Sequence, residues 1–183
     1  IEHCASKKEV AYTPSDFATT NLPQVKLDQI LQDTKVDKIY ALSPLQEGML
    51  FHALHSKESD QYCIQIEGTY EGKLDTKALK SAWEGVINHH DILRTRFIWQ
   101  DVDNPVQVVE SEVSIPWFDE DFSKLSQKDQ TKKLQDYVVK DRFAGFNLSK
   151  PCVMRLHLIK LADNKYHFIW TNHTNIIRIK VFF

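Results

Sequence analysis

Histidine is the residue type in this sequence best suited to acid–base chemistry, because its unperturbed pKa of about 6.5 lets it exchange a proton near neutral pH. The chain contains 8 histidines. His167 and His173 are separated by an even number of positions in one predicted strand, so both imidazoles can face the same side of a sheet. Among the histidines, this pair is the one expected to share a face of a strand.

The other histidine pairs do not indicate a metal site. His89 and His90 adjoin each other at a predicted helix end, so their side chains point in different directions. His52 and His55 lie one helical turn apart, but no carboxylate or cysteine partner accompanies them, and a surface or packing role is expected. We therefore predict no bound metal.

The cysteines indicate a reducing compartment. Cys4, Cys63 and Cys152 are odd in number, far apart and without a CxxC spacing, so neither a disulfide framework nor a zinc knuckle is indicated. This usage is typical of a cytoplasmic protein.

Composition excludes several classes of protein. Of the 183 residues, 42% are hydrophobic and 26% are charged, as in globular domains. The formal net charge of -2 argues against a nucleic-acid partner. Every apolar run is far shorter than the ~20 residues that a membrane helix needs, so no membrane partner is expected either.

Hydrophobic periodicity predicts a mixed α/β domain. A capping box formed by Ser43 and Gln46, with Pro44 at the first helical position, marks the start of one helix. Other helices are expected after Pro23 as far as Asp33, after Asp75 and after Ser126. Strands are expected at 38–42, 62–66, 92–100 and 106–109, with an extended stretch at 115–118 and a hairpin of 153–161 with 166–172.

Four stretches carry a family resemblance. They are SPLQEGMLFH at 43–52, NHHDILRTRF at 88–97, FNL at 146–148 with Arg155, and HFIWTNH at 167–173. In order and spacing, from about Val36 to His173, they resemble the motifs SPxQEGMLFH, RHxxLRTxF, FDLxxxPLxR and HHxxxDG of condensation domains from nonribosomal peptide synthetases. The third stretch departs from its motif, because Pro151 comes one residue early and Cys152 stands where the family has proline.

The resemblance implies an α/β fold of the chloramphenicol-acetyltransferase type, which has two lobes. This chain would hold the N-terminal lobe, a mixed sheet with flanking helices, at 36–183, truncated at the active-site motif. Residues 1–35 would be an interdomain linker with a short helix, and Tyr12–Phe17 resembles the tail of an epimerization domain. Since the first residue is Ile1 rather than Met, we expect a segment of a longer translation product.

The resemblance also implies the chemistry and the partners. Such domains form amide bonds in peptide antibiotic biosynthesis by transferring an aminoacyl or peptidyl group from one carrier protein to an amine on the next. Substrates are attached to the phosphopantetheine of the carriers, and no cofactor is expected to bind the domain directly. The expected partners are carrier domains, neighbouring synthetase domains and the missing C-terminal lobe, all in the cytoplasm.

The active-site motif is degenerate in this chain. His173 matches its first histidine, but Thr174 occupies the position of the second, which the family uses as a base or positioning group. Arg178 replaces the motif aspartate and Ile179 its glycine. A threonine hydroxyl cannot act as a base near neutral pH and Arg178 reverses a charge, so we predict an inactive fragment. A frameshift before the tail 175–183 is our hypothesis for the change.

The remaining motif residues are expected to act structurally. Ser43 and Gln46 belong to the first motif, and His90 and Arg94 to the second, where Arg94 is predicted to form a structural ion pair. His89 stands where that motif has arginine.

Two alternatives remain open. The chain could be a non-catalytic module that binds a carrier or a neighbouring domain, or a free-standing acyltransferase. The latter should retain an intact HHxxxDG motif.

Overall fold

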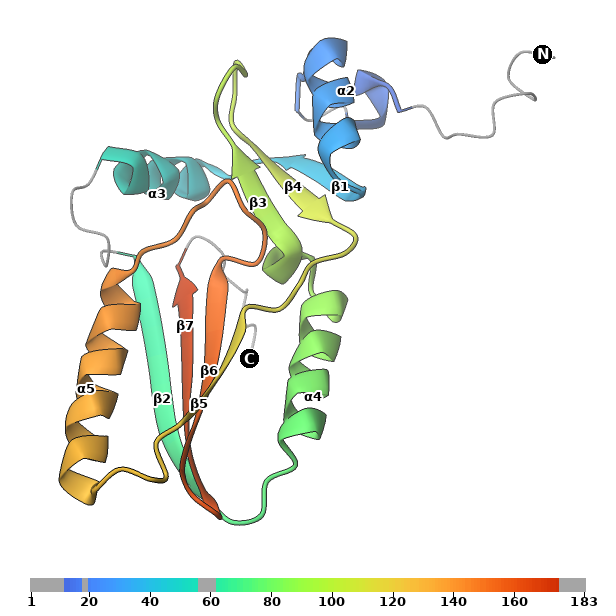
Figure 1. The fold of residues 1–183 in the computed structure, drawn as a ribbon. Helices are drawn as coiled ribbons and strands as arrows, with labels where there is room; N and C mark the ends of the chain where they lie inside the picture. The colour runs from blue at the N-terminus through green and yellow to red at the C-terminus, as the bar shows by residue number, and fades with distance from the viewer. Residues whose placement is uncertain (1–11, 18–19, 56–61, 175–183) are drawn as a thin grey trace, which may run out of the picture.

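Two β-sheets organise the part of the chain that the computed structural model describes, namely residues 12–17, 20–55 and 62–174 (Figure 1). The smaller sheet is antiparallel, in the order β1-β4-β3. The larger sheet has the order β2-β7-β6-β5, and it is mixed because β5 and β6 are parallel while the other neighbours are antiparallel. The bounds are β1 Val36–Ala41, β2 Cys63–Glu71, β3 Thr95–Ile98, β4 Val106–Glu110, β5 Trp117–Asp121, β6 Met154–Ala162 and β7 Lys165–His173.

Helices α4 and α5 cover opposite faces of the larger sheet (Figure 1). Side chains alternate between the two faces of a strand, so one face of β6 and β7 contributes Ile159 and Ile169, which pack with residues of α5. The other face packs with Trp83 and Ile87 of α4. The helices span α2 Gln24–Asp33, α3 Pro44–His55, α4 Thr76–His89 and α5 Gln127–Phe143, with short 3-10 helices η1 Pro14–Phe17 and η2 Asp91–Arg94. The predicted mixed sheet with flanking helices is confirmed.

Local signals place the helix starts correctly. Asp75 accepts hydrogen bonds from the backbone N–H groups of Lys77 and Ala78, which caps α4. At α3, the Ser43 N–H donates to the Gln46 side chain at 2.9 Å and the Gln46 N–H donates to Ser43 Oγ at 3.4 Å. The predicted capping box is therefore confirmed.

Two strands differ from their predicted extents. Strand β2 extends beyond the expected 62–66, because its residues pair with β7 continuously from Cys63 to Glu71. Strand β3 begins only at Thr95, since residues 91–94 form η2, in which the Leu93 N–H donates to the His90 carbonyl. The first difference reflects a pairing partner that lies far away in the sequence, and the second reflects a local turn.

The helix before residue 36 packs against the smaller sheet. Leu27 and Ile30 of α2 are 0% and 3% exposed, and they form one cluster with Ile39, Val106 and Val108. The segment predicted as a linker thus contributes to a hydrophobic core. Within the described residues, no helix combines the length and the apolar character that crossing a membrane requires.

Candidate active site

His173 lies at the end of β7 next to two aromatic rings. Its ring centroid is 6.0 Å from that of Tyr62 and 6.2 Å from that of Phe146, which is nearly perpendicular to it. The side chain is 6% exposed, and burial lowers the pKa of the imidazole to about 4. At neutral pH the ring is therefore uncharged and shielded from water.

Thr174, the next residue, is bound to the chain before β2. Its backbone N–H and its hydroxyl both donate to the Tyr62 carbonyl oxygen, at 2.6 and 2.7 Å. A threonine hydroxyl has lone pairs that accept hydrogen bonds, but it is far too weak a base to take a proton from a substrate at neutral pH. The Thr174 side chain is thus used in a contact with the backbone.

Three neighbouring strands place a row of polar side chains beside His173. Gln65 of β2 pairs with Thr171 of β7, which in turn pairs with Arg155 of β6. All three side chains donate to the carboxylate of Asp141 near the end of α5, at 3.1 Å from Gln65 Nε2 and 2.6 Å from Arg155 Nε. The row therefore anchors α5 across three strands.

Asp141 accepts a further contact from His157. The distance from His157 Nε2 to Asp141 Oδ1 is 3.0 Å, and His157 Nδ1 lies 3.0 Å from the Tyr137 hydroxyl. Burial acts to raise the pKa of Asp141, but hydrogen bonds from His157, Thr171 and Arg155 outweigh it and hold that pKa well below its ordinary value. The carboxylate is ionised at neutral pH.

Reasoning from the sequence misses this network. Arg155 stands out as a motif residue, but nothing in the local pattern of α5 distinguishes Asp141 from the other acidic residues of that helix. The available signal is the even spacing of Arg155 and His157, which puts both on one face of β6.

The first motif fixes α3 to the smaller sheet. Gln46 Nε2 donates to the Gln107 side chain at 3.2 Å, and Gln107 Nε2 donates to the Ala41 carbonyl at 3.1 Å. Helix α3 crosses the end of the larger sheet where β7 stops (Figure 1), and the His52 ring lies 6.5 Å from that of Tyr62. Ser43 and Gln46 therefore orient a helix that borders the site.

The second motif lies where α4 meets the smaller sheet. His90 is exposed and caps the C-terminus of α4 through its backbone N–H. Arg94 is buried, and its Nη2 is 2.8 Å from Asp91 and 3.4 Å from Asp37, while Nη1 donates to the Glu110 carbonyl. Arg94 thus binds η2 to β1 and β4.

His167, another candidate residue, does not lie beside His173. His167 is on the same face of β7 as His173 but lies near the start of the strand. Its Nε2 is 3.0 Å from Glu67, and its Nδ1 is 2.9 Å from the Thr69 hydroxyl. Arg178 and Ile179 lie outside the described residues. In the described part of the chain, no cluster of three or more His, Cys, Asp or Glu residues is arranged to hold a metal ion.

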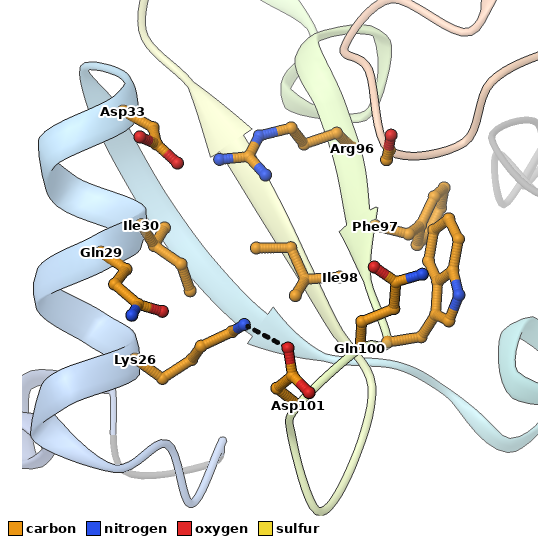
Figure 2. A pocket seen from close by; sticks show the side chains of 11 residues that line it. Lys26, Gln29, Ile30, Asp33, Arg96, Phe97, Ile98, Gln100 and Asp101 are labelled. Carbon is orange, nitrogen blue, oxygen red and sulfur yellow. Dashed lines mark ion pairs between the residues drawn. The ribbon is translucent and has the colours of Figure 1, made fainter.

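A separate cavity of about 210 Å³ lies between α2 and β3 (Figure 2). Figure 2 shows Arg96 extending toward Asp33, and Lys26 facing Asp101 with 3.8 Å between its Nζ and the carboxylate. The residues that line this cavity come mainly from α2 and β3, and His173 is not among them. The cavity therefore belongs to the junction of α2 with the smaller sheet.

Known proteins match most of this chain. The family model described as "Condensation domain" matches residues 36–177. A linear gramicidin synthase of Brevibacillus parabrevis is 38% identical over 174 residues, which are 94% of this chain and 2% of that protein. Bacitracin synthase 3 of Bacillus licheniformis is 33% identical over 94% of this chain and 3% of its own length. The chain thus covers only 2% to 3% of the length of these synthases.

Solved structures show the same fold. The starter condensation domain of rhizomide synthetase superposes with a TM-score of 0.65 at 25% identity, covering 76% of this chain and 34% of that chain. A four-domain nonribosomal peptide synthetase gives a TM-score of 0.67 at 17% identity, covering 78% of this chain and 10% of the other. Taken with the family match over most of its length, these findings establish that the chain belongs to the condensation-domain family of nonribosomal peptide synthetases.

Proposed function

We propose that residues 36–183 are the N-terminal lobe of a condensation domain that does not form amide bonds by itself, preceded by an interdomain segment at 1–35. One observation carries the proposal. Thr174 stands at the position of the family's second histidine, and its hydroxyl donates to the Tyr62 carbonyl at 2.7 Å. The coverage of 34% of a solved condensation domain supports the assignment to one lobe.

The reaction of the family explains why this position matters. The amine nitrogen of one aminoacyl group attacks the thioester carbonyl of another, the carbon–sulfur bond breaks, and the nitrogen loses a proton as the carrier thiol leaves. A well-placed imidazole accepts or holds that proton near neutral pH. Thr174 offers no such group, and the neighbouring His173 is buried with a pKa of about 4. Neither residue is suited to act as the base.

The proposed setting is a multidomain synthetase in the cytoplasm. Carrier domains would present substrates on phosphopantetheine, and a second lobe would complete the walls of the active site. Holding both reactants in one channel is what makes the attack effectively intramolecular. The proposed partners are therefore carrier domains, neighbouring synthetase domains and the C-terminal lobe, with no cofactor bound to this lobe itself.

The test is dipeptide formation between two loaded carrier proteins, followed by mass spectrometry. The native chain is compared with a repaired protein that carries Thr174→His, Arg178→Asp and Ile179→Gly and is joined to a second lobe of the family. A matched control has the same lobe and the last two substitutions but keeps Thr174. We expect product only from the repaired protein.

Other outcomes would overturn the proposal. Product from the native chain alone would show that an imidazole at position 174 is unnecessary, as would equal product from the control. Carrier binding by the native chain, without product from a folded repaired protein, would favour the alternative of a non-catalytic binding module. Acyl transfer from a soluble thioester to a small amine would favour a free-standing acyltransferase.

A further inference from the structure

Arg155 joins β6 to the chain that leaves α5. Its Nε donates to Asp141 Oδ1 at 2.6 Å, its Nη2 donates to the Asp141 carbonyl at 2.7 Å, and its Nη1 donates to the Gly145 carbonyl at 2.6 Å. Gly145 has a φ of 65°, a left-handed conformation that glycine adopts without the penalty of a side chain. The planar guanidinium thus fixes the path of the backbone immediately before Phe146.

Phe146 is consequently held in place from one side. The Arg155 guanidinium carbon lies 4.1 Å from the centroid of the Phe146 ring, a distance typical of a cation–π contact. The same ring meets the His173 ring at 6.2 Å and an angle of 83°, the edge-to-face arrangement that aromatic pairs favour. Arg155, Phe146 and His173 therefore form a continuous chain of contacts from β6 to the end of β7.

Tyr62 is the second aromatic neighbour of His173. The two rings are 6.0 Å apart, and the Tyr62 carbonyl accepts both bonds from Thr174. The His173 N–H donates to the Val153 carbonyl at 3.1 Å, so the backbone is also bound on the side of β6. The place where the chain leaves the sheet is thus determined from both neighbouring strands.

We propose that Phe146 is a positioning residue, held by Arg155, that clamps His173 against Tyr62 and so fixes the direction in which the chain leaves β7 at residue 174. That residue 174 stands at the position of the family's second histidine rests on the proposed function. The clamp itself is a statement about packing, and it is testable without any substrate.

The ionisable side chains around His173 come from several elements. Among the described residues, the Tyr62 ring before β2 is near the His173 ring and Cys63 of β2 pairs with His173. Arg155 of β6, with its partner Asp141 of α5, contacts Phe146, and His52 of α3 is near Tyr62. Arg155 is engaged by Asp141, so removal of the Phe146 ring acts on His173 chiefly by admitting water.

The experiment follows the imidazole of His173 by nuclear magnetic resonance in the full 183-residue chain, between about pH 5 and pH 8. In the native protein we expect no titration in this range. In Phe146→Ala we expect a titration with a midpoint of about 6, near the ordinary value of an exposed histidine. Phe146→Leu, which keeps most of the apolar volume, should leave the midpoint below about 5.

Phe118→Ala is the matched control. Phe118 stacks on His157 at 4.9 Å and 18°, so its removal should change the resonances of His157 and leave His173 without a titration. Arg155→Lys keeps the charge but loses the planar fork, and it should raise the His173 midpoint above about 5 through the freed Phe146 ring. Circular dichroism confirms that each variant is folded.

Two results would overturn the clamp. One is a folded Phe146→Ala protein in which His173 still does not titrate, and the other is an equal response of His173 to Phe118→Ala. If Phe146→Ala does not fold, Arg155→Lys decides between the outcomes, since an unchanged His173 in that variant also contradicts the proposal. Because no carrier or substrate is used, an inactive repaired protein would refute the proposed function and leave this result standing.

Discussion

The Tyr62 carbonyl receives two hydrogen bonds from Thr174, one from the backbone N–H at 2.6 Å and one from the hydroxyl at 2.7 Å. Strands β2 and β7 pair as far as Cys63 opposite His173, so these bonds carry the contact one residue beyond the ladder. Thr174 is therefore bound to the chain that enters β2 through both its backbone and its side chain.

Loss of this hydroxyl should cost stability. Thr174→Val keeps the shape of the side chain, removes the donor and leaves the backbone bond in place. We expect the free energy of unfolding to fall by about 1 kcal/mol, the usual contribution of one such bond. Urea denaturation measures the change, with Thr131→Val as control, because Thr131 makes its side-chain bond to Gln127 on the exposed surface of α5. An equal loss in both variants would contradict the special role of Thr174.

Asp141 should make stability depend on pH in the acid range. Its pKa is lowered in the folded protein, so its contribution is present above the unfolded value of about 3.9 and disappears as the pH falls toward the folded value. Asp141→Asn should lower the free energy of unfolding by about 3 kcal/mol at neutral pH, because Arg155 then loses its buried partner.

The difference between the native protein and Asp141→Asn should shrink below about pH 4. Urea midpoints measured from about pH 3 to neutral pH test this dependence. Asp136→Asn, at an exposed position of the same helix, serves as the control and should change stability little at any pH. A gap that stays constant across the acid range would be inconsistent with the assigned ionisation.

The packing of α2 predicts that this helix unfolds together with the smaller sheet. Leu27→Ala removes a fully buried side chain and should destabilise the protein by roughly 2–5 kcal/mol, the range typical of such substitutions. Val25→Ala changes a side chain that is 72% exposed on the same helix and should have little effect. If α2 were a loose linker, thermal unfolding would be the same for both variants.

Cys152 should be inert toward alkylating reagents in the native protein. Burial raises the pKa of its thiol to about 12, so only on the order of one molecule in 10⁴ carries the reactive thiolate at about pH 8. Iodoacetamide at that pH, followed by peptide mass mapping, should label Cys152 in urea and leave it unlabelled in buffer. Rapid labelling of the folded chain would mean that this part of the core opens readily.

The sequence by itself determined the local elements and the family. Ser43, Asp75 and Ser126 are each followed by an apolar pattern of helical period, and all three precede helices because capping bonds join residues two or three positions apart. The hairpin of β6 and β7 is likewise predicted, since turn-forming residues at 162–165 separate two strand-like runs, and in the structure the strands close to leave only Asp163 and Asn164 between them. The order and spacing of four motifs are enough to name condensation domains, which the family match confirms.

Only the tertiary structure decided what surrounds the candidate site. Asp141 collects donors from Gln65, Arg155 and Thr171, which the sequence separates widely and which only the register of β2, β7 and β6 brings into one row. The same holds for His173, whose burial next to Tyr62 and Phe146 makes it a packed, neutral ring. Periodicity states which face a side chain takes, but the partner it meets there depends on how distant strands are aligned, and that alignment is set by the packing of the whole sheet.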